Sequence, residues 1–245
     1  MKKITKFIVF AILFPALIIS TALLAYLHFF AANDKNLSGE WTASLDMTDQ
    51  AAVTALGWLQ DIEAVSVSMQ DMENTMQGLN IEVQLTFEQA DRSGGTFQCS
   101  VLPESYDACN QAAYEAFALV FRELLAERLR MAGYAGSTDE EAVEALVTET
   151  FGMPTVSYLM TCGPRLLPSM EELQLQYDGS GTYQATGDIL TRQFDDGGAV
   201  ITKTEHYIRK DVSLILMGES DAAPQGQLAD DYPVIYTLQQ SSGQE

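Results

Sequence analysis

The longest hydrophobic run in the chain lies at its N-terminus. Residues 7 to 30 include no Lys, Arg, Asp or Glu. With a rise of about 1.5 Å per residue, a helix over this run crosses a hydrocarbon core of about 30 Å with some tilt. Lys2, Lys3 and Lys6 precede the run, which by the positive-inside rule leaves the N-terminus in the cytoplasm. The pattern predicts a single-pass plasma-membrane signal anchor over 1–32, a linker over 33–38 and an extracellular domain over 39–245.

A cleaved signal peptide is the alternative interpretation of this N-terminus. Signal peptides have an apolar region of only about 7–15 residues, followed by a cleavage site of small residues. The small-x-small site at a suitable distance is Ser20-Thr21-Ala22, and a cut there leaves a hydrophobic new N-terminus. A cut after Ala32 requires Phe30 at a position that prefers a small residue. We therefore expect the anchor to stay attached.

Alternation of apolar and polar positions predicts strands at both ends of the outer region. The clearest strand runs from Ile81 to Glu88, and a glycine-containing turn joins it to a second strand over 97–101. Further strands are expected at 40–45, 181–185, 188–194, 199–208, 212–217 and 234–238, and the alternation of Leu173, Leu175 and Tyr177 predicts one more. About eight or nine strands joined by short turns are enough to close a small antiparallel barrel.

Between these strands the hydrophobic period becomes that of a helix. Helical spacing covers 48–62, 104–131 and 155–162, while 63–77 fits a strand or a helix equally well. Thr138 and Glu141 form a capping-box pattern for one more helix. We therefore predict an α+β protein, with a transmembrane helix followed by an antiparallel β-barrel. A helical insertion at about 104–167 is expected to pack against that barrel.

The net charge of the chain indicates which classes of binding partner are unfavourable. The formal net charge is −21, and all 34 Asp and Glu follow the hydrophobic run, so the outer region is strongly acidic. Phosphate groups are bound by Lys and Arg, so this balance argues against nucleic acid as a partner and against broad attraction to anionic lipid.

The chain has three cysteines, Cys99, Cys109 and Cys162. An odd number allows at most one internal disulfide and leaves at least one thiol over. Cys99 alternates with Phe97 and Val101, so we interpret it as a small buried residue. A Cys109–Cys162 bridge remains one of the three open pairings.

Two blocks of the sequence resemble a known family. Gly39-Glu40-Trp41 is similar to the G-x-W start of lipocalin-like barrels, and the run from Gly181 to Leu190 with the following hairpins resembles lipocalin-like domains of secreted and surface proteins of Gram-positive bacteria. The resemblance implies a barrel with an apolar cavity. Two features depart from it. Helices interrupt the barrel, and the last strand lacks the Arg that packs against the opening Trp in that family.

Catalytic chemistry finds little support in the sequence. Nucleophilic catalysis of the Ser-His-Asp or Cys-His type requires an imidazole, and His206 is the one histidine outside the hydrophobic run. His206 is in phase with Val200 and Ile208, so we interpret it as a polar side chain filling the barrel. One His with three scattered Cys supplies no zinc site. Acidic pairs lie at helix starts or in loops, where water or the helix dipole favours them. We predict neither an enzyme nor a cofactor.

Aromatic residues suggest a binding role instead. Trp41, Phe97, Tyr183 and His206 are the candidate ligand-binding residues of an apolar barrel cavity. The sequence thus predicts a membrane-anchored extracytoplasmic binding module for a small apolar ligand or an envelope protein. Two alternatives stay open: a structural or protein-interaction domain with a filled barrel, and a carboxylate-based enzyme.

Overall fold

The computed structural model describes residues 36–62, 67–196, 199–218 and 233–239. The predicted anchor over 7–30 lies outside these ranges. Within them, no helix is long and apolar enough to cross a membrane. The elements in chain order are β1 Gly39–Asp46, α2 Thr48–Ile62, α3 Met69–Thr75, β2 Asn80–Gln89, β3 Gly94–Val101, α4 Pro103–Met131, α5 Glu140–Phe151, α6 Thr155–Cys162, α7 Met170–Tyr177, β4 Gly179–Thr186, β5 Ile189–Asp196, β6 Ala199–Lys210, β7 Ser213–Gly218 and β8 Val234–Leu238.

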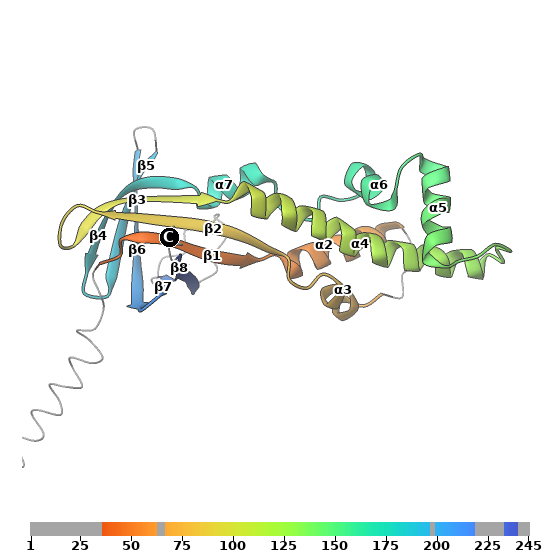
Figure 1. The fold of residues 1–245 in the computed structure, drawn as a ribbon, viewed down its shortest axis with the longest axis horizontal. Coiled ribbons are helices and arrows are strands. Elements are labelled where there is room, and N and C mark those ends of the chain that lie inside the picture. The colour runs from red at the N-terminus through yellow and green to blue at the C-terminus, as the bar shows by residue number, and fades with distance from the viewer. Residues whose placement is uncertain (1–35, 63–66, 197–198, 219–232, 240–245) are drawn as a thin grey trace, which may run out of the picture. The chain divides into compact units, whose positions relative to one another are not determined.

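Strands β1 to β8 form a closed barrel in sequence order, which confirms the predicted α+β barrel class (Figure 1). The β4 to β8 strands pair antiparallel, each with the next. On β2 the four apolar side chains are buried and their polar neighbours are exposed or half-buried, as the alternation predicts. A closed sheet has no free edge, so every strand gains a partner on both sides.

One predicted strand is wrong. Leu173, Leu175 and Tyr177 lie on helix α7, where Leu173 is buried and Leu175 is 83% exposed. Ser169 caps this helix by accepting a hydrogen bond from the Glu172 backbone N–H, and the Glu172 carboxylate accepts from the Ser169 backbone N–H. This capping box starts a helix directly before the alternating residues. A capping box at the start of a helix therefore outweighs a short alternation of apolar and polar residues.

The helix boundaries otherwise follow the sequence closely. Helices α2 and α6 have the predicted bounds, and the ambiguous stretch contains the short helix α3. Helix α5 begins one residue later than predicted, because Asp139 and not Thr138 is its N-cap and accepts from the Ala142 N–H. The chain reverses after α5 at Gly152, whose φ of +74° is favourable for glycine.

The predicted orientation of β6 is also wrong. Glu205 and Tyr207 are buried, at 1% and 0% exposure, whereas Ile208 is 46% exposed. His206 therefore points outward, where its Nδ1 lies 3.2 Å from an Asp188 carboxylate oxygen. Because side chains alternate along a strand, an error of one residue in phase moves the whole set to the other face.

The described chain divides into two compact units. One contains 86–98 and the β4 to β8 strands together with the start of β1, and the other contains Thr42–Leu85 and Cys99–Gly179. In the second unit, α4 packs against α5 and α6, and Trp58 on α2 meets the Phe117 ring on α4 edge-on at 5.7 Å between centroids. Cys99 and Cys109 are buried and Cys162 is exposed, and the Cys109–Cys162 disulfide is not formed.

Candidate functional site

The barrel interior contains a buried ion pair. Arg192 on β5 donates from Nε and Nη2 to the two carboxylate oxygens of Glu205 on β6, each at 2.7 Å. The exposed fractions of the two side chains are 6% and 1%. Lys203 Nζ lies 3.7 Å from one of the same Glu205 oxygens. Two parallel charge-assisted hydrogen bonds fix both the distance and the orientation of the pair.

Aromatic rings enclose the guanidinium of this pair. The Arg192 Cζ lies 5.5 Å from the Phe97 ring centroid and 5.4 Å from that of Phe194. The two rings meet edge-on, with 4.9 Å between centroids. A cation within about 6 Å of a ring face is attracted to the ring quadrupole. The charge pair is thus part of the packed interior.

The predicted ligand residue Trp41 lies at the rim of this barrel. Its indole Nε1 donates to the Leu37 carbonyl at 2.8 Å, and its side chain is fully buried. Arg209 on β6 stacks over the indole, with Cζ 5.5 Å from the ring centroid, and donates to the Asn36 carbonyl. The last strand has no Arg, as the sequence shows, and β6 supplies the one that covers the opening Trp.

Of the other predicted residues, Phe97 and Tyr183 are buried and His206 is not. Tyr183 contacts the Phe87 ring edge-on at 4.7 Å. Its hydroxyl is buried and has no hydrogen-bond partner among the described residues. Burial, with smaller effects from Asp91 and Tyr207, raises the pKa of this hydroxyl, so it is neutral at physiological pH. The structure therefore groups two of the four candidates with the ion pair and separates His206 from them.

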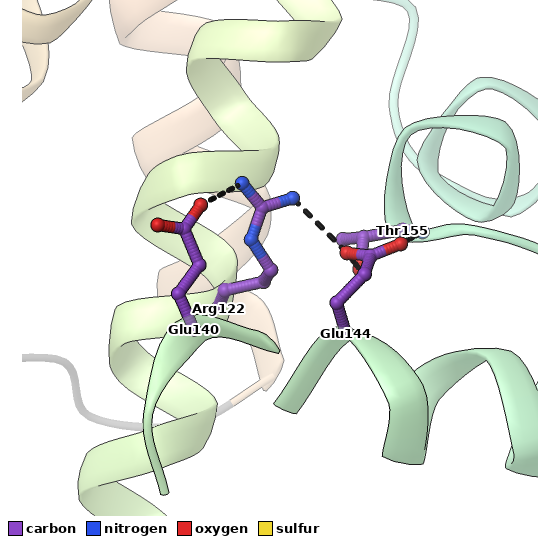
Figure 2. A network of polar contacts seen from close by, with 4 residues as sticks. All are labelled: Arg122, Glu140, Glu144 and Thr155. Atoms are coloured by element: carbon purple, nitrogen blue, oxygen red, sulfur yellow. Dashed lines mark hydrogen bonds and ion pairs between the residues drawn. The ribbon is translucent and has the colours of Figure 1, made fainter. Parts of the chain in front are cut away.

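A second site lies on the helices. Figure 2 shows Arg122 of α4 reaching two glutamates of α5. Its Nη2 donates to Glu140 at 2.7 Å and its Nη1 to Glu144 at 3.1 Å. Glu144 also accepts from the Thr155 backbone N–H at 2.9 Å and from the Thr155 hydroxyl at 2.6 Å. Three helices are thereby tied to one carboxylate.

The electrostatics of Glu144 reflect these contacts. Burial opposes ionisation of the carboxyl, but the two hydrogen bonds from Thr155 and the Arg122 charge outweigh it. The pKa of Glu144 is therefore lowered. The Arg122 Nε is buried and has no partner within the described ranges.

A groove of about 710 Å³ opens beside this network. Its lining residues are Arg122, Glu140, Glu141, Glu144, Ala145, Thr148 and Glu149. Glu141 and Glu149 are exposed, and neither is shared with the Arg122 network. The groove thus presents two available carboxylates beside small side chains.

Neither site was found from the sequence. Helix α5 was predicted only by its capping pattern, and Arg122 was not among the predicted site residues. The acidic residues expected at a helix start are confirmed at 139–141, where Asp139 is the N-cap of α5 and Glu140 and Glu141 lie in its first turn. For the Arg192–Glu205 pair, the sequence offered one signal: Glu205 is two residues from Tyr207 and therefore lies on the same side of the strand. In the described part of the chain, no group of three or more His, Cys, Asp and Glu is placed to hold a metal ion.

Comparison with known proteins adds no identification. The chain matches no protein-family model, no curated protein and no solved structure.

Proposed function

We propose that this chain is a membrane-anchored, extracytoplasmic protein-interaction module in which the barrel is the scaffold and the helices carry the binding groove. The observation that carries the proposal is the contrast between the two candidate sites. Barrel positions are filled by large buried side chains and a closed ion pair. The groove beside α5 is open and contains carboxylates that make no ion pair with Arg122.

The chemistry of the groove favours a basic segment of an envelope protein. Four glutamates and one arginine line it, so the lining has an excess of negative charge. Lys and Arg side chains on an extended segment would meet Glu141 and Glu149, while Ala145 and Thr148 leave room for their aliphatic stems. Complementary charge of this kind speeds association and selects partners. The module has no catalytic role in this proposal.

Calorimetric titration of the full chain with a Lys- and Arg-rich peptide tests this function. A Glu141→Gln, Glu149→Gln double variant should weaken binding and reduce its salt dependence, because it removes the available charges. The matched control removes two exposed carboxylates elsewhere, with Glu104→Gln and Glu171→Gln. Equal affinity of the two double variants, or no binding by the parent, refutes the proposal.

A small apolar ligand in the barrel is the second candidate. The buried Tyr183 hydroxyl without a described partner favours it, since a ligand with one polar atom would satisfy that group. The lipocalin-like resemblance points the same way, and the stack of Arg209 on Trp41 supports it. Native mass spectrometry of the purified chain distinguishes the candidates. A co-purifying small molecule that is lost in Tyr183→Phe supports the ligand.

A further inference from the structure

The outer surface of strands β6, β7 and β8 is apolar, unlike the acidic surface expected from the composition of the chain. Register places Ile208 opposite Ile215, and Ile215 opposite Ile235, so three isoleucines form one row across three strands. His206 lies opposite Met217 in the next row. These five residues with Lys210 are called the β6–β8 face below.

This face is exposed and has no carboxylate. Ile208 is 46% exposed and Ile235 57% exposed, while Ile215 and Met217 are half-buried. The remaining outward positions along 204–210, 213–217 and 235–237 are Thr204, Ser213 and Thr237. None of the 34 Asp and Glu of the chain falls on these outward positions. Two carboxylates border the face: Asp188, on the turn before β5, contacts His206, and Asp211 lies in the turn that follows Lys210.

The described chain begins at the rim beside this face. Arg209 donates to the Asn36 carbonyl, and the Gln239 N–H donates to the Glu40 carbonyl at 2.8 Å. The Leu238 N–H donates to the Val212 carbonyl at 2.7 Å. The entry of the chain, the turn between β6 and β7 and the end of β8 therefore share one rim. Val212 in that turn is itself 41% exposed.

Chain length then limits how far this rim can be from the bilayer. The hydrophobic run ends at Phe30, and residues 31–35 separate it from Asn36. Five residues span at most about 18 Å when fully extended. The isoleucine row begins two residues from the turn, about 7 Å along the strand. An anchored chain therefore keeps this rim close to the bilayer surface.

We propose that the β6–β8 face rests on the lipid surface beside the anchor. An apolar row without carboxylates meets the interface without the repulsion that the acidic remainder of the chain imposes. The inference rests on the membrane anchor of the proposed function.

Quenching by brominated lipid tests the orientation. The full chain is reconstituted into phosphatidylcholine vesicles whose acyl chains carry bromine near the headgroup, in a Trp58→Phe background that leaves Trp41 as the reference. Ile235→Trp places a reporter on the face. Gln184→Trp on β4, also exposed and outward, is the matched control. If Ile235→Trp does not fold by circular dichroism, Thr237→Trp replaces it.

We expect brominated lipid to reduce the emission of the face reporter and to leave the control at the level of the background. Equal loss at both positions overturns the inference. A blue shift of the face reporter that grows with protein-to-lipid ratio, without bromine quenching, shows that a second copy of the chain covers the face and also overturns it. Alkaline washing separates this from the premise: release from the vesicles refutes the anchor, whereas retention without quenching refutes only the orientation.

Discussion

The Arg192–Glu205 pair offers a demanding test of how this barrel is stabilised. Both side chains are almost fully buried and each satisfies the other through two hydrogen bonds of 2.7 Å. Removing one partner of a buried pair leaves the other charge without its counter-ion, at a cost of about 3–5 kcal/mol in the free energy of unfolding. Replacing both by apolar residues of similar volume is often neutral or stabilising.

The two single variants should differ in a predictable way. In Arg192→Met, Glu205 keeps Lys203 at 3.7 Å and can also take up a proton, so the loss should lie near the lower limit of that range. In Glu205→Met, Arg192 cannot lose its proton. The Phe97 and Phe194 rings, at about 0.5–2 kcal/mol each, offset part of the cost of burying this charge, but the loss should still be the larger one.

Urea unfolding of the full chain followed by tryptophan emission measures these differences. A Trp58→Phe background leaves Trp41, which lies within the barrel unit, as the single reporter. The Arg192→Met, Glu205→Met double variant should recover most of the stability that either single variant loses. If the double variant is as unstable as the sum of the two singles, the pair is not coupled and the reasoning is wrong.

The helical network gives a pH-dependent prediction. The pKa of Glu144 is lowered from its ordinary value of 4.5, so its contribution to stability is present above that value and is lost as pH falls through the folded pKa. Glu144→Gln should cost about 1 kcal/mol near neutral pH and flatten the acid side of the stability curve, as followed by thermal melting, because the carboxylate is partly exposed. An unchanged acid slope contradicts this. The cysteines give a third prediction, because burial and Asp46 raise the pKa of the Cys109 thiol to about 11. Near neutral pH a maleimide should label exposed Cys162 rapidly and buried Cys109 only after unfolding. Mass spectrometry of the labelled parent and of Cys162→Ser measures this difference. Rapid labelling of native Cys162→Ser refutes it.

Local chemistry in the sequence determined most of the elements. The alternation in β2 spans eight residues, so its buried face could be assigned without the structure, and the helical spacing of 48–62 gave the bounds of α2. At 173–177 a strand-like alternation competed with a helix start signal, and the hydrogen bonds of the start signal prevailed. The Ser169–Glu172 capping box made a helix of the alternating residues 173–177.

The local sequence pattern did not predict which side of β6 faces the barrel interior. Val200 and Ile208 are exposed, and Glu205 is buried, so the phase of these apolar residues points to the wrong face. The inward position of Glu205 depends on Arg192, which lies thirteen positions earlier on another strand. A charge can be buried only beside a counter-charge, and a partner on another strand is not visible in a local window.

The sequence by itself determined most of the element order, the α+β class and the acidic, carboxylate-rich character of the outer region, because these follow from short-range periodicity and composition. Only the tertiary structure decided which side chains meet: Arg209 on Trp41, Arg192 on Glu205, and Arg122 between Glu140 and Glu144. These contacts join residues that are far apart in the chain, and their energies depend on burial and on distances of a few ångströms. Such quantities exist only once strand register and helix packing have brought the partners together.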